Sequence, residues 1–190
     1  MTYSDVPDFM MELVANGSTS ALALQFQTLT ATRTSEVLQA KWDEIDLDKG
    51  VWTLPSGRMK TRREHRIPFS DAALCILAAL HHLEANPYLF PGFRHSRPLS
   101  NMAVLQLMRG MGYGVNGNQG EHVPHGFRSS FRDWSVEISN FPRDVAEMAL
   151  AHAIKNKVEA AYRRGDLIEK RRKMMQEWAN YLFTSKRALQ

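Results

Sequence analysis

The sequence predicts a mainly helical α+β domain with one small antiparallel β-sheet, and three observations lead to this fold class. Apolar residues recur at helical spacing along most of the 190 residues. Two short stretches, 51–55 and 66–69, have instead the composition of β-strands and flank a basic connection. With 44% hydrophobic and 23% charged residues, the composition is that of a folded protein with a real core. The length suits a single domain.

The first part of the chain predicts two helices and a helical turn. Asp5 and the following Pro7 start a helix that Gly17 ends. Residues 19–29 fit both strand and helix periodicity, and we favour the helix. Ser35 precedes a short helical start, after which the two strands form one hairpin-like unit.

A leucine stripe and a glycine-rich stretch follow in the middle of the chain. Ser70 or Asp71 caps a helix that Asn86-Pro87 ends. One side of this helix carries four leucines: Leu74, Leu77, Leu80 and Leu83. A second helix over 100–108 leads into a loop rich in glycine.

The C-terminal part predicts four helices. The first starts after Pro124 and buries an aromatic and aliphatic stripe: Phe127, Phe131, Trp134 and Ile138. Two short helices follow, over 142–150 and 157–162. Asp166 and Glu169 form a capping-box-like start for a long helix. Its inward side carries Met174, Met175, Trp178 and Leu182.

Charge and composition exclude several function classes. The formal net charge of +4 is modest, but basic residues concentrate at 58–66 and 163–173. The single cysteine excludes an internal disulfide and a zinc site with several cysteines. No histidine lies in an H-E-x-x-H motif, and His81 and His82 are adjacent, so no metal is expected. The glycines from Gly112 to Gly117 match G-x-G-x-x-G but follow a helix, which argues against a dinucleotide site. No stretch resembles a membrane span or a secretory signal, so we expect a soluble, cytoplasmic protein.

The candidate functional residues have ordinary explanations when each is taken alone. His125 and Arg128 are three residues apart, which on a helix brings an imidazole and a cation to one face. A solvated arginine and a hydrogen-bonded histidine at a helix N-terminus explain the same pattern. Arg132 shares that face, so the spacing does not decide which arginine matters. Surface charges, a half-buried histidine and a boundary tyrosine likewise explain Arg33, Lys60, His152 and Tyr162.

As an ordered set, these residues resemble the catalytic constellation of tyrosine recombinases: Arg33, Lys60, His125, Arg128, His152 and Tyr162. The resemblance covers nearly the whole chain and includes TATRTSEVLQAKWDEIDLDKGVWTLPSGRMKTRREHRIPFS, VPHGFRSSFRDWS, LAHA and AAYRRGDLIEKRRKMMQEWANYL. These segments look like the catalytic domain of a prophage or genomic-island integrase of the satellite-phage type. Ala151 stands where many recombinases have glycine before the histidine.

The resemblance implies the DNA breaking-rejoining fold and a site-specific recombinase that integrates or excises a mobile element. Tyr162 would attack a DNA phosphodiester and form a 3′-phosphotyrosyl bond, which needs neither ATP nor a metal nor another cofactor. Arg33 and Arg128 would bind the phosphate oxygens, and His152 would donate to the phosphate. Lys60 would protonate the departing 5′-oxygen.

Supporting roles follow from the same resemblance. His125 would assist proton transfer or hold the site, and Glu36 would orient an arginine. Basic residues outside the catalytic set would hold the DNA backbone, with Arg58, Arg62 and Arg63 as candidates.

The resemblance also implies partners and a domain organisation. Residues 1–190 would be one catalytic domain, a fragment without the N-terminal arm-binding and core-binding domains. Its partner would be double-stranded DNA carrying attachment core sites, on which the full-length enzyme forms a tetramer, while the free fragment is monomeric. DNA-bending proteins and an excisionase would be accessory partners, in the bacterial cytoplasm at the nucleoid.

Two alternatives remain open at this stage. Type IB topoisomerases share the catalytic residue types but religate the same strand, so relaxation of supercoils without strand exchange would identify one. A catalytically inactive DNA-binding regulator would form no covalent DNA adduct.

Overall fold

The structure is a computed structural model, and it describes all residues except 60, 82–85, 95, 115–120, 153–164 and 185–190. Its helices are α1 (Val6–Asn16), α2 (Thr19–Thr30), α3 (Thr34–Leu38), α4 (Asp71–Ala79), α5 (Asn101–Gly110), α6 (Phe127–Glu137), α7 (Arg143–Ala149) and α9 (Ile168–Phe183). Short 3-10 turns are η1 (Trp42–Glu44), η2 (Ser56–Arg58) and η3 (Pro124–Gly126), and the strands are β1 (Ile45–Asp46), β2 (Val51–Leu54) and β3 (His65–Pro68). The predicted fold class is confirmed.

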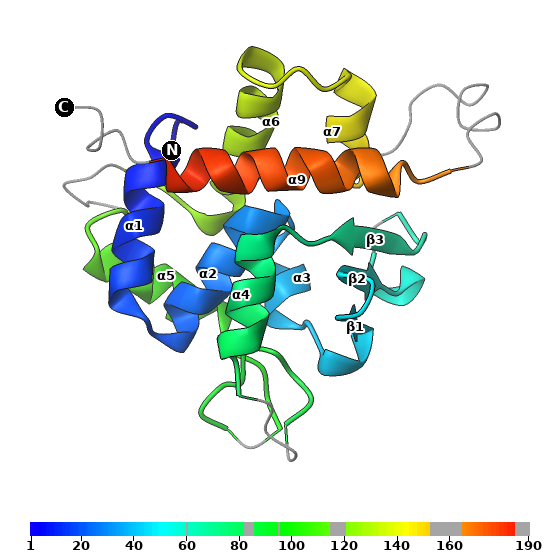
Figure 1. Ribbon diagram of the computed structural model, residues 1–190. Helices are drawn as coiled ribbons and strands as arrows, with labels where there is room; N and C mark the ends of the chain where they lie inside the picture. Colours follow the sequence, from blue (N-terminus) through cyan, green and yellow to red (C-terminus); the bar gives the residue numbers. More distant parts are fainter. Residues whose placement is uncertain (60, 82–85, 95, 115–120, 153–164, 185–190) are drawn as a thin grey trace.

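Helices α2 and α9 organise the domain. Helix α2 contacts six other helices, namely α1, α3, α4, α5, α6 and α9. Figure 1 shows α9 crossing the molecule, with α6 and α7 on one side and α2, α4 and the sheet on the other. The Trp178 indole N–H of α9 donates to the Thr28 carbonyl of α2 over 2.9 Å. The two helices are therefore joined by a hydrogen bond as well as by apolar packing.

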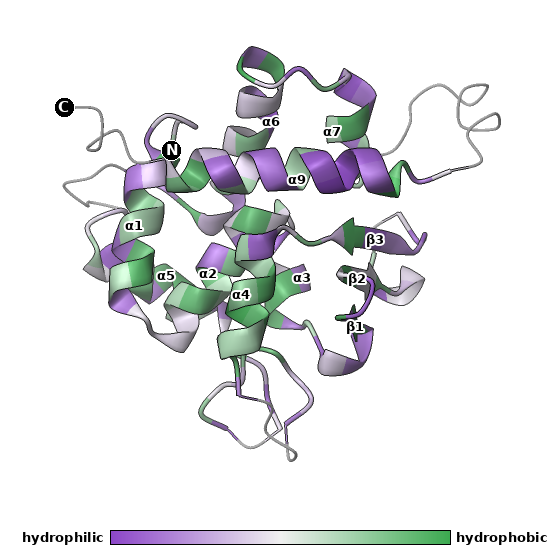
Figure 2. Ribbon diagram, in the orientation of Figure 1, coloured by the Kyte–Doolittle hydropathy of each residue, from purple (hydrophilic) through white to green (hydrophobic). Residues whose placement is uncertain are grey.

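The core consists of aromatic clusters at the junctions of these elements. The Phe26 ring lies 5.7 Å from Trp52 and 5.8 Å from Phe69, between centroids, which joins α2 to the sheet side. The Trp178 ring lies 5.0 Å from Trp134, which joins α9 to α6. In Figure 2 apolar residues dominate α4, whereas α9 alternates between hydrophilic and hydrophobic turns, as expected for a helix with one exposed face.

The sheet is antiparallel with strand order β1-β2-β3. Trp52 lies opposite Ile67 in β3 and opposite Ile45 in β1. The predicted pairing of the two central stretches is confirmed. Strand β1 is an addition to the prediction, because a strand of two residues has no periodicity to detect.

Two helix boundaries differ from the predicted ones. Helix α4 ends at Ala79, because Leu80 adopts an extended backbone (ψ 138°) and its N–H closes the last turn on Ile76 and Leu77. Of the predicted leucine stripe, Leu77 is buried beside Ala73 and Ile76, Leu80 lies past the helix, and Leu83 lies outside the described residues. Helix α6 ends at Glu137, so Ile138 falls outside the helical stripe and is 51% exposed rather than buried.

The helix starts at α3 and α9 also differ. Arg33, rather than Ser35, is the N-cap of α3. At α9 the predicted capping box does not form, because Leu167 occupies the N-cap position with φ 53°. Asp166 Oδ1 accepts the Ile168 N–H over 3.2 Å. Its other oxygen, Oδ2, forms ion pairs with Arg66 of β3 and Arg171 of α9. The expected inward face of α9 is confirmed, because its four predicted apolar residues are all buried.

Candidate active site

Arg33 is held in place by Glu36 at the start of α3. The Glu36 carboxylate accepts the Arg33 backbone N–H over 2.7 Å and pairs with Arg33 Nη1 over 2.6 Å. The Glu36 side chain is only 6% exposed, while that of Arg33 is 26% exposed. One carboxylate thus caps the helix and orients a guanidinium that still reaches solvent.

Arg58 supports the same helix from the sheet side. Its Nη2 donates to the Glu36 carbonyl over 2.6 Å, and its Nη1 pairs with Glu44. Glu44 also accepts the Trp52 indole N–H over 3.0 Å. The Arg58 guanidinium is therefore engaged within the protein, so its contacts do not favour the DNA-binding role expected for it, which stays a prediction.

The other predicted residues of this basic segment lie after η2. Arg62 and Arg63 are exposed in the connection between β2 and β3, and Arg62 has φ 52°. Their exposure is compatible with DNA contacts, which stay a prediction. Lys60 lies outside the described residues.

Arg128 is buried and joins the ends of two helices. Its Nη1 donates to the Ala31 carbonyl after α2 over 2.5 Å, and its Nη2 donates to the Leu150 carbonyl after α7 over 2.6 Å. Arg128 is 7% exposed, so the alternative of a solvated arginine is wrong at this position. Burial, together with the nearby charge of Arg33, lowers the pKa of Arg128 to about 10, at which it remains protonated at neutral pH.

Arg128 and Arg132, between which the spacing could not decide, have different surroundings. Arg132 lies one turn further along α6, its side chain is 51% exposed, and its Nε lies 3.7 Å from a Glu147 oxygen. The charge effect of Arg33 on Arg128 places these two guanidinium groups in one electrostatic neighbourhood. The structure thus brings Arg33 and Arg128 together and directs Arg132 towards α7.

His152 is positioned by the end of α7. The Ala151 N–H binds the Met148 carbonyl over 3.1 Å and the His152 N–H binds the Glu147 carbonyl over 3.0 Å, the two bonds of a Schellman motif. Ala151 has φ 51°, the left-handed conformation that this motif requires. His152 therefore lies two residues after Leu150, the residue whose carbonyl accepts a hydrogen bond from Arg128.

Replacing Ala151 by glycine should stabilise the fold. An L-residue in the left-handed region carries a steric cost of about 1–2 kcal/mol that glycine avoids, partly offset by the greater freedom of glycine in the unfolded chain. We expect Ala151→Gly to raise the free energy of unfolding by about 1 kcal/mol in urea titrations. As a control, Ala149→Gly within α7 should lower it, and a loss of stability in Ala151→Gly would contradict the strain.

His125 precedes α6 in the 3-10 turn η3 and is exposed. The Gln27 side-chain amide of α2 donates to the Pro124 carbonyl over 2.8 Å and so anchors this turn. His125 and Arg128 therefore lie on successive elements rather than on one regular helix, and only Arg128 is buried. Tyr162, the predicted nucleophile, lies outside the described residues.

His65 is a half-buried histidine near the site that sequence reasoning did not select. It lies in β3 opposite Leu54. Burial lowers the pKa of His65 to about 4, and the charges of Arg171, Arg128 and Arg33 act in the same direction. A hydrogen bond with the Ala149 backbone opposes them, with less effect than burial or Arg171. Strand alternation was the available signal, because it places His65 on the same face as the buried Ile67.

The lowered pKa of His65 predicts that the free energy of unfolding decreases in acid. Between its ordinary pKa of 6.5 and the folded-state value of about 4, the unfolded chain binds the proton more readily than the folded chain. The stabilisation is complete above pH 6.5 and is lost as the pH falls to 4, by up to about 3 kcal/mol. His65→Gln should flatten this part of the unfolding profile, and an unchanged slope in this variant would contradict the assignment.

Arginines of the second basic segment fasten α9 to the sheet. Arg171 is 1% exposed and donates from Nη1 to the Arg66 carbonyl over 2.7 Å. Asp166 Oδ2 lies 3.3 Å from Arg171 Nη2 and 3.2 Å from Arg66 Nη1. Arg172 Nη1 donates to the Gly50 carbonyl over 3.0 Å. In the described part of this segment, these two arginines are structural.

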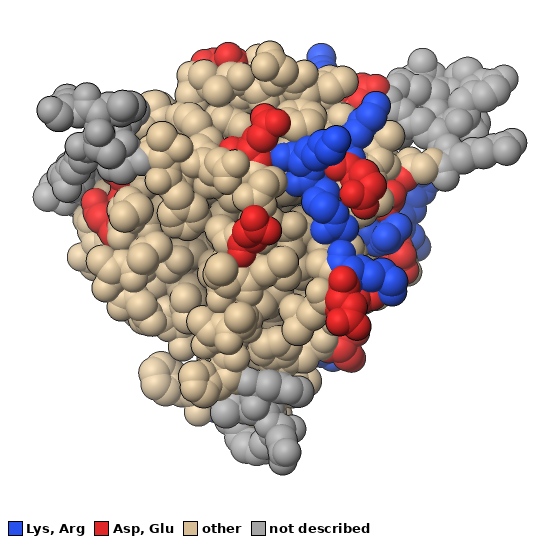
Figure 3. All heavy atoms as spheres, in the orientation of Figure 1, with Lys and Arg blue, Asp and Glu red and all other residues tan. Residues whose placement is uncertain are grey.

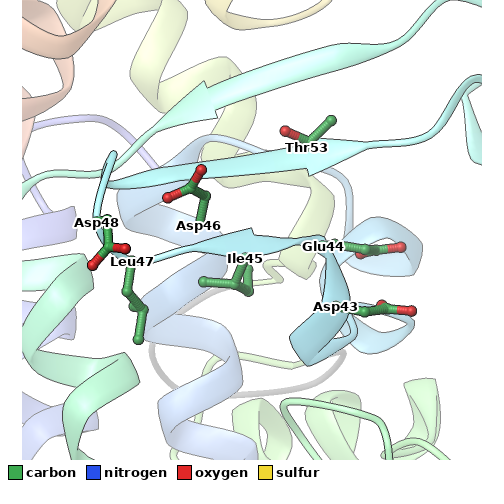
Figure 4. A pocket seen from close by; sticks show the side chains of 7 residues that line it. All are labelled: Asp43, Glu44, Ile45, Asp46, Leu47, Asp48 and Thr53. Atoms are coloured by element: carbon green, nitrogen blue, oxygen red, sulfur yellow. The ribbon is translucent and has the colours of Figure 1, made fainter.

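Charged side chains are distributed unevenly over the surface. Figure 3 shows Lys and Arg gathered where α9 begins and the sheet lies, with Asp and Glu among them. A hollow beside β1 is rich in carboxylates; it is lined by Asp43, Glu44, Ile45, Asp46, Leu47, Asp48 and Thr53 (Figure 4). Its acidic side chains would repel a phosphate backbone, so we place no DNA there. Among the described residues, no group of carboxylates, histidines and cysteines is arranged to hold a metal ion, and no helix is long and apolar enough to cross a membrane.

Comparisons with known proteins match this chain to integrases. Residues 1–167 match the Phage integrase family. Prophage integrase IntA of Escherichia coli K12 is 37% identical over 182 residues, which cover 92% of this chain and 43% of the relative. The integrase of Enterobacteria phage P4 is 33% identical over 196 residues, covering 94% of this chain and 44% of the relative. The chain thus spans less than half the length of these curated relatives.

Solved structures with the same fold are recombinases. A lambda integrase dimer bound to a core site matches with a TM-score of 0.58 and 22% identity, covering 81% of this chain and 57% of that one. The XerA recombinase matches with a TM-score of 0.60 and 17% identity, covering 87% and 61%. The helices and small sheet described above therefore form the tyrosine recombinase catalytic fold. Together with the match over residues 1–167, this shows that the chain belongs to the phage integrase family.

Proposed function

We propose that the chain is the catalytic domain of a site-specific DNA recombinase that cleaves and rejoins strands through a 3′-phosphotyrosyl bond to Tyr162. The buried charge of Arg128 carries this proposal. In the described part of the chain, two carbonyls bind its guanidinium and no carboxylate forms an ion pair with it. A buried cation is costly unless it is paired, and the neighbouring charge of Arg33 adds repulsion that the Glu36 carboxylate only partly offsets. A DNA phosphate between the two arginines would relieve both effects.

The reaction would proceed by exchange of one phosphate ester for another. The Tyr162 oxygen forms a bond to phosphorus while the bond between phosphorus and the 5′-oxygen breaks. Arg33 and Arg128 stabilise the charge on the non-bridging oxygens, and His152 donates to one of them. Lys60 protonates the 5′-oxygen, and His125 assists proton transfer. The ester bond to tyrosine retains the energy for rejoining, so no ATP or metal is needed.

The relatives support a wider assembly for the full-length protein. One solved lambda integrase is a dimer bound to a core site, and another is a tetramer bound to a Holliday junction. By analogy, the substrate is double-stranded DNA with attachment core sites, and the full-length protein acts as a tetramer that integrates or excises its element. DNA-bending proteins and an excisionase would assist it in the bacterial cytoplasm.

A nicked attachment-site duplex tests the proposal. The nick is placed so that the short strand with the 5′-hydroxyl diffuses away after cleavage, which traps the covalent complex. We expect a denaturation-resistant protein–DNA complex from the full-length protein, with a nucleotide attached to Tyr162 in peptide mass spectrometry. DNA binding without an adduct would favour an inactive regulator, and relaxation of supercoils without strand exchange would favour a topoisomerase.

A further inference from the structure

Two side chains outside the proposed catalytic set support His152, because Glu147 contacts its ring and Arg132 contacts Glu147. The ring Nδ1 of His152 lies 2.7 Å from Oε2 of Glu147, which sits in the last turn of α7. The other oxygen, Oε1, lies 3.7 Å from Nε of Arg132 on α6. The Glu147 carbonyl also accepts the His152 backbone N–H over 3.0 Å. Glu147 thus contacts both the main chain and the ring of the same histidine.

The hydrogen bond determines which ring nitrogen can face DNA. An ionised carboxylate only accepts hydrogen bonds, so Nδ1 of His152 must carry the proton that points to Glu147. The Nε2 atom is then the one left for a phosphate oxygen, to which it donates when the ring is doubly protonated and both nitrogens carry a proton. Without the carboxylate, a histidine that is 38% exposed would exchange between tautomers and ring orientations.

The turn that carries this pair makes it more than an ordinary surface ion pair. Such pairs contribute little when two flexible side chains must be ordered against water. Here both residues belong to one Schellman motif, whose backbone bonds fix the separation of Glu147 from His152. Arg132 restrains the second carboxylate oxygen from the neighbouring helix. Because the fold already restrains both residues, aligning the ring costs little additional side-chain entropy.

We propose that Glu147 is a positioning residue that accepts the Nδ1–H of His152 and so directs Nε2 to the scissile phosphate, to which Nε2–H of the doubly protonated ring donates. This inference rests on the proposed recombinase function for its catalytic consequence, but the ring geometry stands independently of it. Arg132 serves the same arrangement through Glu147 rather than through DNA.

A double-mutant cycle in the full-length protein tests the catalytic part. Glu147→Ala should slow formation of the covalent adduct by about 10- to 100-fold, the usual effect of removing a group that orients a ligand or catalytic side chain. Glu147→Gln keeps an acceptor for Nδ1–H and should restore the rate to within about 5-fold of the unmutated protein. In a His152→Ala background, Glu147→Ala should have no further effect, because the two residues act as a unit. Glu177→Ala, which removes an exposed carboxylate of α9, should leave the rate unchanged.

Nitrogen NMR of the chain without DNA tests the geometry separately. The ¹⁵N shifts of His152 should report a protonated Nδ1 in the unmutated chain and mixed tautomers in Glu147→Ala. Mixed tautomers in the unmutated chain, or additive rate losses in the double mutant, would overturn the positioning role. A fixed tautomer in a protein that forms no adduct would instead refute the recombinase proposal and leave the geometric inference standing.

Discussion

Tyr162→Phe should abolish the covalent protein–DNA adduct while leaving DNA affinity nearly unchanged. The substitution removes one oxygen, the proposed nucleophile, and no basic side chain that would contact phosphates. Covalent complex formation on the nicked duplex and binding by fluorescence anisotropy should be measured on the same full-length preparation. Loss of the adduct at constant affinity assigns the chemistry to this hydroxyl.

The other tyrosines provide the control for this experiment. Tyr88 is half-buried outside the helices and lies opposite Lys41 in an isolated β-bridge. Tyr88→Phe should retain full adduct formation. An adduct that survives in Tyr162→Phe would require a different nucleophile, and mass spectrometry of the trapped peptide would identify it.

Periodic features of the sequence predicted the core of the fold well. The aromatic stripe of α6 and the methionine and tryptophan face of α9 are buried as expected, because both helices pack along a continuous apolar side. Strands β2 and β3 were also predicted correctly. Strand β1 and the early end of α4 were not, since a two-residue pairing and a change of backbone angle at Leu80 depend on tertiary contacts.

The arginines show where local sequence reasoning fails. Arg58 and Arg171 belong to basic segments that suggest contact with DNA, yet both are engaged inside the protein. Arg58 pairs with Glu44 and Arg171 binds the Arg66 carbonyl, and such partners lie too far along the chain to be inferred from charge patterns. Charge density alone therefore does not distinguish arginines that hold the fold together from arginines whose guanidinium groups are free to bind a partner.

The candidate site was predicted from the order of its residues along the chain, which resembles that of tyrosine recombinases, and not from their spacing. No periodicity relates Arg33 to Arg128, and their proximity arises because α2 and α6 pack together and Arg128 binds the carbonyl at the end of α2. The contact between Glu147 and His152 had no recognised signal either. It follows from the Schellman turn that ends α7, and Ala151 hides that turn where glycine would have marked it.

Lys60→Ala should slow cleavage of ordinary DNA by about 10²- to 10⁴-fold, the usual contribution of a positioned general acid. A substrate in which sulfur replaces the bridging 5′-oxygen needs little protonation, because a thiolate is a much better leaving group than an alkoxide. The Lys60 variant should therefore cleave the sulfur substrate at nearly the unmutated rate. The experiment uses the full-length protein at saturating DNA, so that a weaker phosphate contact does not limit the rate.

Arg62→Ala provides the matched control: removing this exposed cation from the same connection should affect binding and not the preference for sulfur. Equal rate losses of Lys60→Ala on both substrates would mean that Lys60 only positions DNA. In that case the same sulfur substitution applied to a His125 variant would show whether the acid lies at the turn before α6.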